Sequence, residues 1–143
     1  MPRGYYHQNI DGIEVYRYPS FHVPRLVSDG QKLPLNPGIL WHIAREKFDV
    51  LHVHGMTPGT TDLSVLVGKA RQKPVVLTYH YDVVASKGFI SMLKPIFQRY
   101  ARNVINKADI VTILSSTYGR TSPVLSCIDR GKIVAIPGGV DLN

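Results

Sequence analysis

The sequence predicts one α/β domain of Rossmann-like architecture, a mostly parallel sheet with helices on both faces. Short apolar runs at 49–55, 74–80, 109–116 and 132–141 have the length of buried strands, the last ending in a glycine turn. Longer stretches with helical spacing separate them. The length of 143 residues suits one such domain and excludes two enzymatic domains. We therefore treat residues 1–143 as one domain.

The N-terminal third predicts a strand, a surface connection and a helix. Apolar and polar residues alternate over 12–19, which indicates a strand that ends at Pro19. The following connection, 19–36, contains several prolines and is expected at the surface. Asn36 and Pro37 are typical of a helix start, and the apolar spacing ends near Lys47.

Helical spacing returns at 60–72, at 88–108 and, over a shorter length, at 121–125. The helix at 88–108 is strongly amphipathic, with Pro95 near its start or at a kink. No glycine-rich turn follows the first predicted strand, and the chain stops directly after the last one. A doubly wound sheet normally opens on a strand with a phosphate-facing loop, so we expect the first βα unit to be absent.

Composition narrows the class of protein. Hydrophobic residues make up 44% and charged residues 19%, which predicts a folded chain. The single cysteine, Cys127, cannot form an intramolecular disulfide, and neither a signal peptide nor an apolar run of membrane-spanning length occurs. We expect a cytoplasmic protein.

The net charge of +7 is concentrated in one segment. Between residues 63 and 108, eight lysines and arginines face one acid, Asp82. Such a segment suits an anionic membrane, a nucleic acid or small anions, and charge alone leaves these open. Nucleic acid is the least favoured, because the segment carries no interleaved aromatic stacking surface and no recognised module.

Several chemistries lack their motifs. The phosphate-binding glycine patterns and the G-x-S-x-G elbow are absent, which leaves nucleotide hydrolysis and serine-hydrolase chemistry unsupported. His52 and His54 share one side of a strand, as metal ligands could, but no carboxylate accompanies them. We expect no metal site. The alternative is a hydrogen-bonded core histidine at 52 and a polar edge residue at 54.

Polar residues follow the predicted strands at the edge where open α/β sheets bind ligands. His54 and Gly55 end one strand, and Tyr79 to Asp82 end the next. Ser115 and Ser116, and Gly138 and Gly139, would reach the same edge. His80 and Asp82, with aromatic rings beside them, could form hydrogen bonds to sugar hydroxyls. An equally good interpretation is that they are the first residues of a loop and have no binding role.

Four motifs in order, DVLHVHG, KPVVLTYHYDVV, ADIVTILSSTYGRTSPVL and KIVAIPGGVD, resemble the N-terminal, acceptor-side domain of family 4 glycosyltransferases of the GT-B fold. The resemblance spans residues 11–143. It implies a retaining glycosyltransferase, of hexosyltransferase type, acting in polysaccharide or glycolipid biosynthesis. Such an enzyme moves a sugar from a nucleotide-sugar to a lipid-linked or saccharide acceptor without a resident cofactor.

The family's glycine-rich loop and C-terminal donor domain are not found in this sequence, so we expect a fragment that is inactive alone. The resemblance also assigns roles to residues. It implies that His80 and Asp82 are catalytic, that His54, Gly55 and Tyr81 border the acceptor, and that Gly138, Gly139 and Asp141 form the turn between domains. Gly138 stands where the family usually has asparagine.

A different class of function remains open, a non-catalytic binding module that docks on a membrane or a partner protein. Lys94, Arg99 and Arg102 lie on the polar side of the predicted helix at 88–108. Its apolar side is expected against the sheet, so attraction to an anionic leaflet would be electrostatic. This interpretation predicts a peripheral location at the inner face of the cell membrane.

Overall fold

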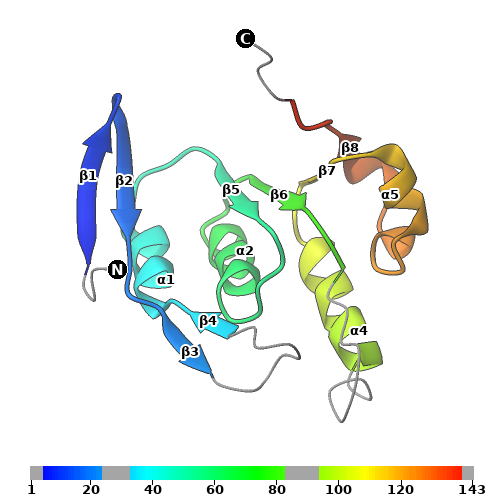
Figure 1. Ribbon diagram of the computed structural model, residues 1–143, viewed down its shortest axis with the longest axis horizontal. Coiled ribbons are helices and arrows are strands. Elements are labelled where there is room, and N and C mark those ends of the chain that lie inside the picture. Colours follow the sequence, from blue (N-terminus) through cyan, green and yellow to red (C-terminus); the bar gives the residue numbers. More distant parts are fainter. Residues whose placement is uncertain (1–4, 24–32, 83–93, 140–143) are drawn as a thin grey trace.

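The computed structural model describes residues 5–23, 33–82 and 94–139 and confirms the α/β class (Figure 1). The strands are β1 (Tyr6–Ile10), β2 (Ile13–Arg17), β3 (Phe21–Val23), β4 (Leu33–Leu35), β5 (Leu51–His54), β6 (Val75–Tyr79), β7 (Ile110–Ile113) and β8 (Ile133–Ala135). The α-helices are α1 (Pro37–Arg45), α2 (Thr61–Ala70), α4 (Lys94–Ile105) and α5 (Ser116–Thr121). Two short 3₁₀ helices, η1 (Leu125–Cys127) and η2 (Arg130–Lys132), precede β8.

The central sheet has the order β5-β6-β7-β8, and all three pairings are parallel. A helix lies in each connection: α2 after β5, α4 after β6 and α5 after β7. The four predicted strands are therefore confirmed, as is the Rossmann-like arrangement. The sequence predicted helices on both faces of the sheet, but the described helices α2, α4 and α5 all pack on one face. Because neighbouring strands run in the same direction, their carboxyl ends meet at one edge of the sheet.

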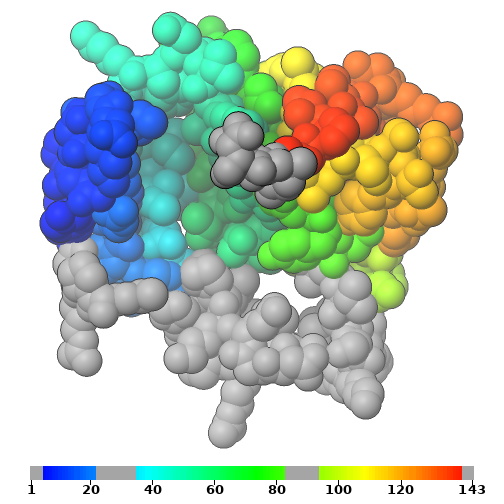
Figure 2. Space-filling model, turned by 45° about the horizontal axis from the view of Figure 1, so that its top comes forward, coloured from blue at the N-terminus to red at the C-terminus, as the bar shows by residue number. Residues whose placement is uncertain are grey.

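The N-terminal segment forms two antiparallel pairs outside this sheet. The strand predicted at 12–19 is β2, but it pairs with β1 in a hairpin. Asp11 and Gly12 both have positive φ, 51° and 82°, as a tight two-residue hairpin turn requires. The predicted surface connection contains a second pair, β3 with β4. In Figure 2 the hairpin lies at one end of the molecule, with β7, α5 and β8 toward the other.

One face of the sheet holds the core. Alternate residues of β5, β6 and β7 are buried beneath α2, α4 and α5; the cluster includes Val53, Val75, Leu77, Tyr79, Val111 and Ile113, with Val65, Ala101, Val104 and Ile105 from the helices. On the opposite face His52, His54, Ile110 and Val134 are exposed. His52 is therefore not the core histidine that one interpretation of the sequence predicted, because the core lies on the other side of its strand.

The C-terminal half differs from the prediction in detail. The strand predicted at 109–116 ends at Ile113, and residues 116–121 form α5, which the sequence did not predict. The helix predicted at 121–125 is not formed; α5 ends at Thr121, and the 3₁₀ helix η1 begins at Leu125. Ser115 begins α5, its hydroxyl accepting a hydrogen bond from the amide of Tyr118 at 3.1 Å. Pro95 lies within α4. The part of that predicted helix from 88 to 93 lies outside the described residues.

No helix within the described parts of the chain has both the length and the apolar character needed to cross a membrane.

Candidate active site

The carboxyl ends of β5 and β6 bring two predicted site residues, His54 and Gly55, beside the segment that carries His80. His54 pairs with Thr78 in the sheet register, and the amide of Gly55 donates to the carbonyl of Thr78 at 2.8 Å. Gly55 has φ +75°, a conformation that disfavours other residues. Apart from Gly55 itself and its two chain neighbours, no described residue has an atom within 4 Å of where a Cβ would stand. Gly55 thus ends the strand and leaves open space next to His54.

His54 and His80 contact each other across this edge. Nδ1 of His54 lies 3.3 Å from Nε2 of His80, and the rings stack with centroids 5.5 Å apart. Burial, and then the charges of His52 and His80, lower the pKa of His54 below its ordinary value. His54 is therefore mainly uncharged at neutral pH, and the pair is joined by a hydrogen bond in which one ring donates and the other accepts.

Next to the His54–His80 pair, a row of hydrogen bonds crosses the face of the sheet opposite the core. Nε2 of His52 lies 2.7 Å from Oγ1 of Thr78, which lies 2.7 Å from Oγ1 of Thr112. The row crosses β5, β6 and β7. The ring of His52 is 4.4 Å from that of His54. The hydrogen bond to Thr78 orients the ring of His52. Because this ring contacts that of His54, it limits the orientations that His54 can take.

Asp82 lies away from the histidine pair, in a cluster of hydroxyl groups. Its Oδ1 accepts from the hydroxyls of Tyr79 at 3.1 Å and Ser122 at 2.9 Å, and its Oδ2 accepts from Tyr118 at 3.2 Å. Burial, followed by the negative charge of Asp82, raises the pKa of Tyr118 to about 12 and raises that of Tyr79 as well. The two tyrosine hydroxyls therefore remain protonated and act as donors. Asp82 has no hydrogen bond to His80, and its contacts join the end of β6 to α5.

The remaining predicted residues lie at or near the same edge. Tyr81 is 61% exposed and presents its ring to solvent. Gly138 and Gly139 are exposed, with open space where a Cβ would be, whereas Asp141 lies outside the described residues. The structure adds Leu114 and Ile136, 47% and 55% exposed, directly after β7 and β8. Sequence reasoning missed these two, although an apolar residue directly after a buried strand was the signal.

The three cations predicted to face a membrane are not equivalent. Lys94 and Arg99 are exposed, whereas Arg102 is half-buried and its Nη2 donates to the carbonyl of Pro123 at 2.7 Å. Arg102 therefore joins α4 to the segment before η1. Ile96, expected on the apolar side, is 67% exposed near the start of the helix.

Among the described residues, no group of three or more histidine, cysteine, aspartate or glutamate side chains is placed to hold a metal ion. Asp82, the acid nearest to His80 in the sequence, accepts hydrogen bonds from Tyr79, Tyr118 and Ser122 instead. The chemistry available at this edge is hydrogen bonding by imidazole and stacking by an exposed aromatic ring, both of which suit a sugar.

A parallel sheet whose strands are joined by crossover helices defines a Rossmann-like domain. More narrowly, the model of Glycosyltransferase Family 4 matches residues 2–143, and the chain belongs to this family. The resemblance drawn from four motifs is thus confirmed, and the match also includes the hairpin. No curated protein and no solved structure gave a match to the chain.

Proposed function

We propose that this chain is the acceptor-side part of a retaining glycosyltransferase, one that transfers a sugar from a nucleotide-sugar to a lipid-linked or saccharide acceptor. The observation that carries the proposal is the His54–His80 pair at the carboxyl edge of the sheet, beside the open space at Gly55. Family membership supports the type of reaction. The nucleotide-sugar is a substrate, so the proposal needs no resident cofactor.

His80 would bind the reacting sugar. Its Nε2 is engaged by His54, while its Nδ1 makes no hydrogen bond to another described residue. That nitrogen is free to meet a sugar hydroxyl, and the contact with His54 fixes the ring for it. Tyr81 would stack its exposed ring on the acceptor, and the absence of a side chain at Gly55 would leave room for it. In this arrangement Asp82 positions the loop that carries His80.

The donor would be held by a second domain, joined through the turn at Gly138, Gly139 and Asp141. We expect the purified 143-residue chain to transfer no sugar, because transfer requires the donor diphosphate to be fixed against the acceptor. A chimera that continues the chain with the donor domain of a family 4 relative should transfer. Mass spectrometry of the products formed from a labelled nucleotide-sugar measures transfer by the 143-residue chain and by the chimera.

Transfer by the 143-residue chain itself would contradict the expected inactivity. A chimera that is folded in both domains, binds the donor and still transfers nothing to any saccharide or lipid-linked acceptor would contradict the proposed function. The donor domain assayed alone with the same acceptors is the control, since activity there would assign the reaction to the added domain.

A second candidate function, docking on an anionic membrane at the cytoplasmic face, is favoured by α4. Lys94 and Arg99 are exposed on this helix, and Ile96 between them is 67% exposed. An exposed apolar side chain flanked by cations suits the boundary between headgroups and acyl chains. The proposal therefore adds an apolar contact to the electrostatic attraction expected from the sequence. Arg102, held by Pro123, contributes little to it.

We expect the chain to sediment with vesicles containing anionic lipid at low salt, and less at high salt. Each cation near an anionic leaflet contributes about 1 kcal/mol, so Lys94→Gln with Arg99→Gln should weaken binding roughly thirtyfold. The pair Arg45→Gln and Lys47→Gln on and after α1 is the charge-matched control. Equal binding to neutral vesicles, or equal loss in the control, would exclude this surface.

A further inference from the structure

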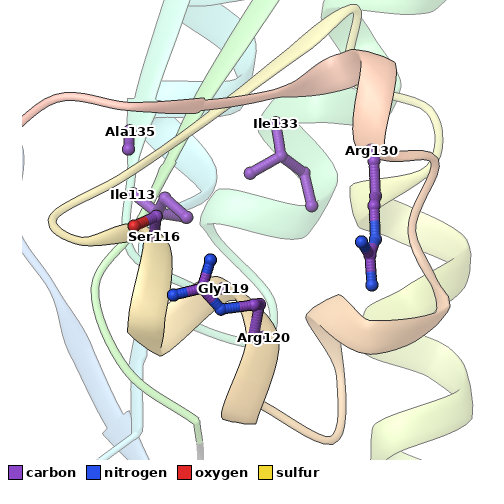
Figure 3. A pocket seen from close by; sticks show the side chains of 7 residues that line it. All are labelled: Ile113, Ser116, Gly119, Arg120, Arg130, Ile133 and Ala135. Carbon is purple, nitrogen blue, oxygen red and sulfur yellow. The ribbon is translucent and has the colours of Figure 1, made fainter.

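A cavity of about 190 Å³ lies away from the histidine pair, between α5, η2 and β8 (Figure 3). Ile113, Ile133 and Ala135 form its apolar part, and Ser116, Arg120 and Arg130 bring polar groups to it. Gly119 lets α5 lie close to the sheet, since a Cβ there would come within 2.5 Å of Cδ1 of Ile113. In Figure 3 the side chains of Arg120 and Arg130 extend from α5 and from η2 toward this space.

The charge of the cavity is not balanced by the protein. Neither Arg120 nor Arg130 forms an ion pair or a hydrogen bond with another described residue, and no acid is among the residues that line the cavity. The nearest acid in the sequence, Asp129, accepts from the amide of Gly131 at 2.9 Å and caps η2. By contrast, the guanidinium of Arg71 donates to the carbonyls of Ile43 and Glu46. The N–H groups of Arg120 and Arg130 are therefore available to donate hydrogen bonds to a ligand.

The shape and chemistry of the cavity select the ligand. Guanidinium groups pair with phosphate oxygens through two parallel hydrogen bonds, and two such groups suit the charge of a phosphate better than a single carboxylate. The volume lies below the roughly 300–1,000 Å³ of sites that enclose a whole small molecule, so the cavity fits a compact anionic group. We propose that it binds a phosphate group through Arg120 and Arg130, with the hydroxyl of Ser116 as a further donor.

This site is independent of sugar transfer, because none of its residues belongs to the histidine pair or its hydrogen-bonded neighbours. The phosphate could be free or part of an organic diphosphate. Uridine diphosphate compared with inorganic pyrophosphate distinguishes these sources: tighter binding of the nucleotide assigns the site to a phosphorylated organic ligand, and equal binding assigns it to the free anion. Both results support the proposal, and binding of neither would overturn it.

The experiment is an NMR titration of the arginine Nε–Hε signals of the 143-residue chain at constant ionic strength. Phosphate and pyrophosphate should cause saturable shifts at Arg120 and Arg130, with pyrophosphate the tighter ligand. Acetate is the comparison anion and should cause much smaller shifts. Shifts that do not saturate, or acetate binding as tight as phosphate binding, would overturn the proposal.

Variants distinguish specific binding at this cavity from nonspecific attraction between the anion and a basic protein. Arg120→Gln with Arg130→Gln should weaken pyrophosphate binding at least tenfold, whereas Arg45→Gln with Lys47→Gln, which removes the same charge elsewhere, should leave it unchanged. Arg120→Lys with Arg130→Lys keeps the charge but loses the planar fork, and should weaken binding severalfold. Circular dichroism verifies that each variant is folded. If the double glutamine variant does not fold, the double lysine variant is used for the test instead. Equal weakening in the charge-matched control would refute the site.

Discussion

Replacing His80 by alanine in the chimeric enzyme should lower sugar transfer by about a hundredfold, with little change in stability. Loss of one well-placed hydrogen-bonding group at a reacting centre has an effect of about this size. His80 is half-buried rather than part of the core, so its removal leaves no large cavity. The measurement is kcat and KM for both substrates, together with the midpoint of thermal unfolding.

His7→Ala is the matched control, because His7 lies on β1 in the hairpin, outside the four-stranded sheet. It should retain full transfer. His54→Ala should cause a smaller loss than His80→Ala, since His54 acts only by orienting the ring of His80 in this proposal. A His80→Ala enzyme with unchanged kcat and KM would show that the role implied by family resemblance does not apply to this chain.

The sheet was predictable from the sequence because its signal is local. β5, β6 and β7 are short apolar runs bounded by polar or proline residues, and each of them supplies buried side chains to the core. The helical spacing between these runs predicts parallel strands, and parallel strands place His54 and His80 at the same edge of the sheet. The contact between their rings then follows from the pairing of β5 with β6.

The elements that were missed carry weak local signals. α5 has six residues, including Gly119 and two threonines, and none of its residues is buried, so no apolar periodicity marks it. The hairpin partner β1 consists largely of polar and exposed residues. Strand pairing of β3 with β4 spans a segment rich in proline. Pattern and propensity rules detect buried faces, and neither α5 nor β1 has a buried side chain.

The surroundings of Asp82 and Arg102 could not be predicted for a different reason. Tyr118 and Ser122 lie 36 and 40 residues after Asp82, and Pro123 lies 21 residues after Arg102. These contacts depend on where α5 and the turn after it pack, which the sequence pattern does not determine. Asp82, which the sequence assigned to the active site, therefore contacts α5 and the residue after it, and Arg102, assigned to the membrane surface, contacts Pro123. The sequence pattern predicts neither contact.

Asp82→Ala should lower the free energy of unfolding by about 3 kcal/mol, the second large effect expected. The substitution removes the shared acceptor of three hydroxyls, and Tyr79 is only 1% exposed, so water cannot readily replace the carboxylate there. Asp82→Asn keeps one oxygen as an acceptor and should cost about 1 kcal/mol. Urea unfolding followed by circular dichroism measures both.

Asp49→Ala is the matched control, because Asp49 is exposed and has no hydrogen bond to a described residue; it should change stability by no more than about 0.5 kcal/mol. In the Asp82→Ala background, a further Tyr118→Phe change should cost almost nothing, since its hydroxyl has already lost its acceptor. These measurements also separate two roles for Asp82. A variant that loses stability and regains transfer on cooling identifies a positioning residue, whereas a variant as stable as the control but without transfer would restore the catalytic role that the family resemblance implies.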